Sequence, residues 1–374
     1  MDNNTKAFFA LLRAGLWEKD VRLLSFGDID YSKILSLAEE QSVVGLVAAG
    51  LEHVRDLKVP KMDVLQFAGQ ALVLERQNTA MNKFLGELVD KMRAEGIYTI
   101  LVKGQGIAQC YDRPLWRACG DVDFFLNEEN YNKAKAFLMP LASSIEIEGD
   151  YSKHQGLTID SWEVELHGSM RCGLSKRIDT GINESQRKVF DEGSVRVWMN
   201  GETQVFLPGV DEDVIFVFTH FLKHFYKEGL GLRQVCDWCR LLWIYKDSLN
   251  HRLLKSRIQQ MRLMSEWKAF GSFAVEYLGM PVEAMPLFNE NDNHNDRLKR
   301  KAARICEFIM EVGNMGHNRD SSYFRRYPYL IRKVLSFKRR SGDLLRHARI
   351  FPLDSVRFFP SIVFLGLRSA VKGG

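Results

Sequence analysis

The chain contains 374 residues, of which 46% are hydrophobic and 26% charged, and its formal net charge at pH 7 is +5. This composition is typical of a folded globular protein and excludes wholesale disorder. The length predicts two or three compact units. The polar residues 1–6 precede only a short apolar run, and no apolar stretch reaches the length of about 20 residues that a membrane span needs. We therefore expect a cytoplasmic protein with no integral membrane span.

Residues 1–95 are predicted to be helical. Their clearest pattern is an apolar stripe at helical spacing, formed by Met81, Phe84, Leu85, Leu88 and Met92. Gly96 follows this stripe, at the position where a glycine often ends a helix.

Short segments rich in β-forming residues follow between residues 96 and 207. We predict strands or strand-like pieces at 98–102, 121–126, 144–148, 156–159 and 162–166. A hairpin is predicted at 195–206, with Asn200-Gly201 as its turn. Helical stretches are expected at 104–111 and at about 129–138.

The helical period returns at Asp211, which is expected to cap a helix whose apolar face contains Val214, Val217, Phe218, Phe221, Leu222 and Phe225. A second helix is predicted at about 232–246, with Cys236 and Cys239 as buried thiols on its apolar stripe. The predicted fold class is α+β. A small mixed β-sheet core at 96–207 is flanked by helical regions at 1–95 and 208–374.

Two carboxylates stand out in the middle of the chain. Asp121 and Asp123 lie at positions i and i+2 of an apolar strand, so both side chains point to one face with about 7 Å between their Cα atoms. Carboxylates this close repel each other unless one is protonated or a cation lies between them. Carboxylate oxygens are ligands that Mg²⁺ prefers, and such acids can hold two metal ions about 3.5–4 Å apart for phosphoryl transfer. A third acid is available, because Glu163, Glu165 and His167 alternate with apolar residues along the segment 162–167.

A family resemblance rests on these residues and their neighbours. The pattern Leu101-Val102-Lys103-Gly104, then Ala108, Tyr111, Pro114 and Arg117, closing on Gly120-Asp121-Val122-Asp123-Phe124, resembles the bacterial nucleotidyltransferase-like family usually described as uncharacterised nucleotidyltransferase. That family is a distant branch of the DNA polymerase beta-like superfamily. The later acid-x-His of the family is matched by Glu165-Leu166-His167, and the likeness continues to His220, His224, Arg233 and Asp237.

The resemblance implies a role for each matched position. Asp121 and Asp123 would be metal ligands, and Glu165 a third ligand or the base that deprotonates the acceptor. Lys103 and Gly104 would hold the triphosphate, Lys103 by its charge and Gly104 by close approach of its backbone N–H. Arg117 would bind phosphate with two parallel hydrogen bonds. We place His167, His220 and Arg233 among the candidate nucleotide-binding residues.

Two helical pairs have simpler alternatives. His220 and His224 lie at i and i+4 and could bind a metal or phosphate, or merely hydrogen-bond their neighbours. Arg233 and Asp237 share this spacing and could pair with each other.

The C-terminal segment from Arg319 onward carries 13 Lys and Arg residues against three acids. Aromatic residues alternate with the basic ones at Phe324-Arg325-Arg326-Tyr327, Phe337-Lys338-Arg339-Arg340 and Arg357-Phe358-Phe359. A solvated basic helix face is the first interpretation, and weak contact with a polyanion or an anionic membrane is the second.

Three functions are weighed. The first is metal-dependent transfer of a nucleoside monophosphate from an NTP, with Mg²⁺ or Mn²⁺, to an acceptor that the sequence does not identify. The second is metal-dependent glycosyl transfer from a nucleotide sugar, which also uses an Asp-x-Asp. Such enzymes usually begin with a nucleotide-binding βαβ unit, whereas this chain opens with helices. The third is an inactive nucleotide-binding scaffold, against which the intact acids argue.

Overall fold

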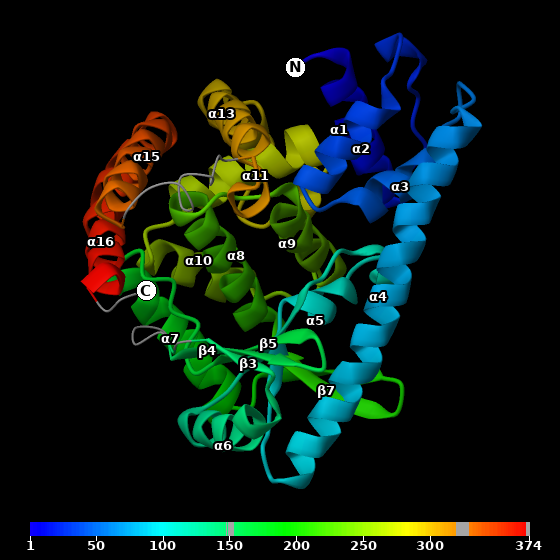
Figure 1. Cartoon of the computed structure of the whole chain (residues 1–374). Coiled ribbons are helices and arrows are strands. Elements are labelled where there is room, and N and C mark those ends of the chain that lie inside the picture. The colour runs from blue at the N-terminus through cyan, green and yellow to red at the C-terminus, as the bar shows by residue number, and fades with distance from the viewer. Residues whose placement is uncertain (147, 149–152, 319–328, 372–374) are drawn as a thin grey trace.

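The computed structural model describes residues 1–146, 148, 153–318 and 329–371. It is an α+β fold, as predicted, in which a seven-stranded mixed sheet is flanked by helices (Figure 1). Among the described residues, no helix is both long and apolar enough to cross a bilayer.

The N-terminal region is helical, as expected, with α1 (Asn3–Trp17), α2 (Tyr31–Glu40), α3 (Val44–Glu52) and α4 (Lys61–Ala94). α1 and α3 approach closely at Gly15 and Gly50. A Cβ on Gly15 would lie 1.8 Å from the Leu46 carbonyl oxygen, and one on Gly50 would lie 2.0 Å from that of Leu11. Larger residues at either glycine would therefore force the two helices apart.

Helix α4 runs from the N-terminal helices to the sheet and contacts both α3 and strand β7 (Figure 1). It ends next to Gly96, whose positive φ of 68° is the left-handed conformation that glycine favours. The predicted stripe holds, because Met81, Leu85, Leu88 and Met92 are all buried against the sheet.

The sheet has the strand order β3-β4-β5-β2-β1-β7-β6. Its strands are β1 (Ile100–Val102), β2 (Asp121–Phe125), β3 (Ser144–Ile145), β4 (His154–Ile159), β5 (Trp162–His167), β6 (Val195–Asn200) and β7 (Thr203–Pro208). β2 pairs antiparallel with β1 and parallel with β5. The predicted hairpin forms, but its two central residues are Gly201 and Glu202, because Asn200 already pairs with Thr203.

Helices cover the two faces of the sheet differently. One face packs against α4 and α6 (Glu128–Leu138), through a core that includes Val122, Phe124 and Val164. The other face meets α7 (Lys176–Asp191) and α8 (Val210–Lys227), where Phe125 contacts Phe190 and Phe216. The acids of β2 point to this second face. Helix α7 was not expected from the sequence analysis.

The rest of the chain is mainly helical and packs around α8. Its helices are α9 (Leu232–Ile244), α10 (His251–Gln260), α11 (Met264–Leu278), α12 (Glu290–Asn293), α13 (Asp296–Val312), α15 (Tyr329–Ile350) and α16 (Pro352–Val371), and the short α5 (Gly104–Ala108) follows β1. The predicted cap of α8 is wrong, because Gly209 occupies the cap position. Asp211 instead accepts a hydrogen bond from the Asn250 backbone N–H at 2.8 Å.

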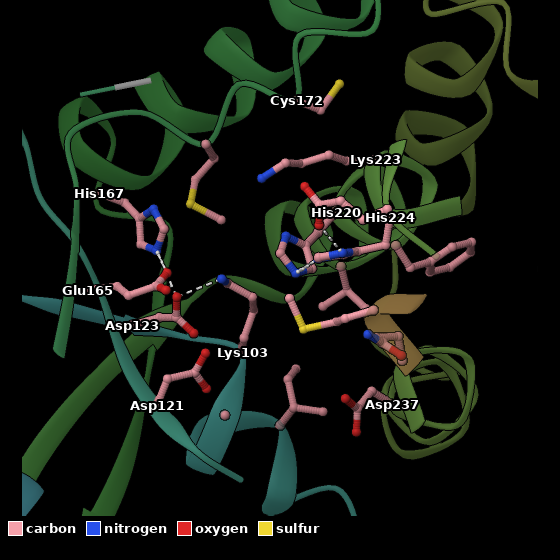
Figure 2. Close-up of a pocket in the computed structure, with 18 of the residues that line it drawn as sticks. Lys103, Asp121, Asp123, Glu165, His167, Cys172, His220, Lys223, His224 and Asp237 are labelled. Atoms are coloured by element: carbon pink, nitrogen blue, oxygen red, sulfur yellow. Dashed lines mark hydrogen bonds and ion pairs between the residues drawn. The ribbon is translucent and has the colours of Figure 1, made fainter. Parts of the chain in front are cut away.

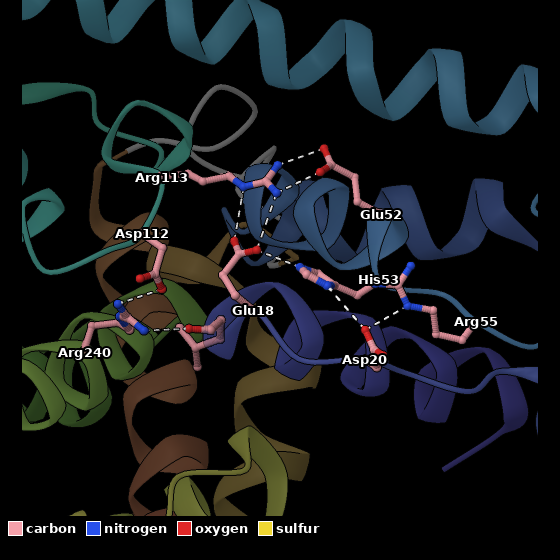
Figure 3. A network of polar contacts seen from close by, with 9 residues as sticks. Glu18, Asp20, Glu52, His53, Arg55, Asp112, Arg113 and Arg240 are labelled. Carbon is pink, nitrogen blue, oxygen red and sulfur yellow. Dashed lines mark hydrogen bonds and ion pairs between the residues drawn. The ribbon is translucent and has the colours of Figure 1, made fainter.

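A polar network fastens the N-terminal helices to the rest of the molecule (Figure 3). Arg113 donates to both carboxylate oxygens of Glu52, at 2.8 and 2.7 Å, and pairs with Glu18 at 3.1 Å. Arg240 of α9, buried at 2% exposure, donates to the carbonyl oxygens of Cys110 at 2.7 Å and Leu16 at 3.0 Å. Segments from all three predicted regions are thus joined by charged side chains.

Candidate active site

Three carboxylates meet on the sheet face that is turned toward α8. Asp121 and Asp123 project from β2, and the parallel register with β5 places Glu165 beside Asp123. One oxygen from each of the three acids lies within 4.8 Å of the others. The alternation of the strand causes this meeting, because Val122 and Phe124 take the opposite face and are buried there.

Asp123 is the most buried of these acids, with 1% exposure. Its Oδ1 atom accepts two hydrogen bonds, from Lys103 Nζ at 2.6 Å and from His167 Nε2 at 2.7 Å. Both partners were named as site residues from the sequence. The structure brings them onto the same carboxylate oxygen.

Glu165 lies between two histidines. Its Oε2 atom is 3.0 Å from His154 Nε2 and 3.2 Å from His167 Nε2. Burial raises the pKa of this carboxyl, but the two histidines and the charge of Lys103 lower it more, so the pKa of Glu165 lies well below its usual range. His154, Glu165 and His167 also form a second group whose atoms could hold a metal ion.

The acids and Lys103 shift each other's titration. The charge of Asp123, followed by burial, raises the pKa of Asp121 above its usual value. Burial lowers the pKa of Lys103, but the carboxylates of Asp123, Glu165 and Asp121 outweigh it and raise that pKa. The ammonium group of Lys103 therefore already offsets the repulsion between these carboxylates.

The Lys103-Gly104 turn holds the lysine in place. Lys103 has φ 57° and ψ −144°, a backbone conformation that favours glycine. Gly104 has φ +40°, and a Cβ on it would lie 3.3 Å from Cys119 Sγ and 3.4 Å from the Asp121 carbonyl oxygen. The turn is thus packed tightly against the start of β2.

Helices α8 and α9 supply the opposite wall of a cavity of about 320 Å³. His220, Lys223 and His224 come from α8, and Arg233 comes from α9. Figure 2 shows His220 and Lys223 facing the acids across this space. Its volume lies within the range of ligand pockets in proteins, about 300–1,000 Å³. One wall is therefore acidic, and the other combines the positive charges of Lys223 and Arg233 with the carboxylates of Glu228 and Asp237.

Most residues of this cavity lie within the part of the chain that matches a known protein family. The model of the family described as uncharacterised nucleotidyltransferase matches residues 27–279, which include every residue of both walls named above. The chain belongs to this family. Its membership supports a nucleotidyltransferase role, and the acidic cluster could bind a metal ion. No curated protein and no solved structure shows significant similarity to the chain.

Arg117 lines the cavity, but its guanidinium is paired. It donates to both carboxylate oxygens of Asp237, at 2.9 and 2.7 Å, and Tyr111 also donates to Asp237. The pairing of Arg233 with Asp237 considered from the sequence is therefore wrong. Arg233 instead donates to the Ala118 carbonyl oxygen at 2.8 Å.

His154, Lys223 and Glu228 are among the cavity residues that were missed from the sequence. His154 lies just before the predicted strand at 156–159, and the cross-strand register pairs it with His167, which brings its ring within 3.0 Å of Glu165. Lys223 and Glu228 flank His224, and only the one-turn spacing from His220 could have drawn attention to Lys223. Among the described residues, Lys223 has no hydrogen-bond or ion-pair partner.

The described part of the basic C-terminal segment contributes no residue to the lining of this cavity. Residues 324–327 lie outside the described part of the chain. In α15 and α16, Arg346 pairs with Glu311, Arg357 pairs with Asp354, and Arg340 donates to the Ile362 carbonyl oxygen. Contact of this segment with a polyanion or an anionic membrane stays a prediction.

Proposed function

We propose that the chain transfers a nucleoside monophosphate from an NTP to an acceptor group, with Mg²⁺ or Mn²⁺ held by Asp121, Asp123 and Glu165. The observation that supports this most is the convergence of three carboxylates from neighbouring strands in a cavity with basic residues opposite. An NTP carries a polyanionic triphosphate, whose α-phosphate would react with the help of the metal ions. The acidic wall would hold the metal ions, and the basic residues opposite would bind the phosphates.

The three carboxylates fit a hard divalent cation. All three offer oxygen, the ligand that Mg²⁺ prefers, and their mutual repulsion would be relieved by positive charge. When bound, two such ions would offset the charge that develops on the attacking and leaving oxygens. Lys103 Nζ now contacts Asp123 Oδ1, so a metal ion on this carboxylate would compete with the ammonium. We expect metal binding to release this ammonium toward the phosphates.

The opposite wall would bind the triphosphate. Lys223 is the first candidate, because it lines the cavity and has no partner among the described residues. Arg233 is the second, since only one of its guanidinium nitrogens has a described acceptor. Arg117 would act indirectly, because its ion pair with Asp237 fixes the segment before β2 against α9. Gly104 would keep the backbone close to the phosphates.

The test is a thermal-shift screen against the four NTPs and several nucleotide sugars, with and without Mg²⁺ or Mn²⁺. Ligand at about 100 times its dissociation constant adds roughly 2.7 kcal/mol to the stability of the folded state. A shift that needs both metal ion and NTP supports the proposal. A shift with nucleotide sugars alone would favour glycosyl transfer, and no shift with any ligand would favour an inactive scaffold.

Removing one carboxylate should remove the metal-dependent response. We expect Asp121→Asn and Asp123→Asn to abolish the metal-dependent NTP shift and to lower turnover by about 10²–10³-fold, a loss like that of other electrostatic contributions to catalysis. Glu163→Gln is the matched control, because Glu163 lies beside Asp121 in the strand register but is exposed and outside the acid cluster. Near-full activity of both Asn variants, with unchanged circular dichroism, would rule out the metal site.

A further inference from the structure

Three polar side chains in close contact follow one another along one side of α8 into the cavity. His224 Nδ1 lies 2.8 Å from Glu228 Oε2, and His224 Nε2 lies 2.9 Å from His220 Nε2. Glu228, His224 and His220 follow one another at one-turn spacing, so the helix itself aligns them. All three line the cavity, and Figure 2 shows His220 nearer to the acids than His224.

The ionised carboxylate of Glu228 sets the direction of the hydrogen bond between the two histidines. Burial raises the pKa of Glu228, but the hydrogen bond from His224 outweighs it, and the result is a pKa of about 2. The ionised Glu228 places its negative charge beside His224 Nδ1, so we infer that His224 carries its proton on that nitrogen. In the neutral relay, His224 Nε2 then accepts from His220 Nε2–H. The remaining ring nitrogen of His220, Nδ1, is left as an unprotonated acceptor, and no described residue is bonded to it.

The surroundings of His220 keep it neutral until substrate arrives. Burial, followed by the charge of Lys103, lowers the pKa of His220 well below its usual value. Lys103 and His167 on other elements and Lys223 on α8 lower this pKa and so disfavour a protonated His220. The three carboxylates of the acidic wall face His220 across the cavity, but burial and these groups outweigh them. The negative charge of a bound triphosphate would act in the opposite sense and strengthen His220 as a base.

Glu165, the other candidate base, is less suited to that role. Two histidines already contact its Oε2 atom, at 3.0 and 3.2 Å. A proton that arrived on this oxygen would have to displace one of these contacts. Glu165 is better suited to bind a metal ion.

We propose that His220 is the general base of the reaction and that the acceptor carries a hydroxyl group, because a phosphate or carboxylate acceptor would have no proton to lose. This inference rests on the proposed nucleotidyl transfer. The hydroxyl O–H bond breaks and its proton moves to His220 Nδ1, while the oxygen forms a bond to the α-phosphorus. The bond from the α-phosphorus to the oxygen bridging the β-phosphorus breaks, and pyrophosphate leaves with that electron pair. His224 and Glu228 are positioning residues, which fix the tautomer and stabilise the resulting imidazolium.

The first part of the test needs no acceptor. Nitrogen NMR of the intact protein reads the protonation of both ring nitrogens of each of its nine histidines, and the signals lost in His220→Gln assign His220. We expect a neutral ring near pH 7 with the proton on Nε2, and a mixture of tautomers in Glu228→Gln. The matched control is Glu290→Gln, which breaks an exposed Glu–His pair of the same one-turn spacing with His294. A proton on Nδ1 of His220, or a charged ring, would overturn the proposal.

The second part measures turnover as pyrophosphate release from each NTP, with water alone and with mixed hydroxyl, carboxylate and phosphate compounds as acceptors. We expect release with hydroxyl acceptors, a loss of about 10²–10⁴-fold in kcat for His220→Gln with an unchanged NTP-induced thermal shift, and a smaller loss for Glu228→Gln. Unchanged turnover in His220→Gln, or release only with the other acceptor classes, would overturn this inference alone. A wild-type protein with neither NTP binding nor pyrophosphate release would instead remove the proposed function.

Discussion

Lys103 combines a charge that the site uses with a backbone conformation that disfavours it. Its φ of 57° and ψ of −144° suit glycine, and a side chain held in such a region costs about 1–3 kcal/mol. The residue gains an ion pair with Asp123 at 2.6 Å in return. A glycine at position 103 would form the turn without strain but would lack the ammonium group. A strained lysine at this position is therefore what one expects if the charge is needed for function.

Substitutions at this position can separate the two effects. Lys103→Ala and Lys103→Gly both remove the ammonium, and both should weaken NTP binding. Only the glycine relieves the backbone strain, so Lys103→Gly should be more stable than Lys103→Ala by about 1–3 kcal/mol in urea unfolding. Equal stabilities would mean that the turn is not strained, and unchanged NTP affinity would remove Lys103 from the site.

Some site residues could be predicted from the sequence and others could not. Asp121, Asp123 and Glu165 were found because strand alternation is a local property that spacing reveals. The pairing of Arg117 with Asp237 joins residues 120 positions apart, so local spacing could not show that this guanidinium is occupied. His154 escaped notice for the same reason, since its partner is set by the register between two strands.

At the scale of elements, the strands and most helices could be predicted because their apolar periods are strong. Helix α7 was missed although the signal was present, since Ser175 caps it and its buried Ile178, Ile182 and Val189 have helical spacing. Strand β1 is shorter than expected, because Tyr98 and Thr99 precede the paired residues. The order of the strands depends on long-range pairing and was not predicted.

The packing of α11 against α8 and α16 contains a buried acid. Burial, followed by the charge of Asp354, raises the pKa of Glu266 to about 8, and Tyr226 donates to it at 3.2 Å. An unfolded glutamic acid titrates near 4.5. Between these values the unfolded chain releases a proton that the folded chain keeps, so folded-state stability is full below about 4.5 and falls as pH rises toward 8.

Unfolding measured across this pH range should show the effect. We expect the free energy of unfolding to fall by up to roughly 1.4 kcal/mol per pH unit from this one group, and Glu266→Gln to flatten the dependence. Glu276→Gln, on the same helix but exposed, is the matched control. A pH dependence that is identical in wild type and Glu266→Gln would show that Glu266 titrates normally.

Arg240 connects segments of the molecule that lie far apart in the sequence. It donates to carbonyl oxygens of α1 and of the segment after α5, and it pairs with Asp112 at 2.9 Å. Arg240→Ala would leave these buried carbonyl groups without a donor. We expect a loss of about 2–5 kcal/mol in denaturant unfolding, with the transition still cooperative.

The same network offers a control for this substitution. Arg55 pairs with Asp20 at 2.8 Å, but both side chains are more than half exposed. Arg55→Ala should therefore cost no more than about 1 kcal/mol. Similar losses for Arg55→Ala and Arg240→Ala would contradict a special role for the buried arginine.

The two walls of the cavity also appear at different times during synthesis. Asp123 and Lys223 are 100 residues apart, which a ribosome adds in roughly 5–20 s at about 5–20 residues per second. A nascent chain thus contains the acids, with Lys103 as their nearby cation, well before it contains the helix that faces them. If NTP binding needs both walls, the growing polypeptide cannot bind nucleotide until Arg233 has left the exit tunnel.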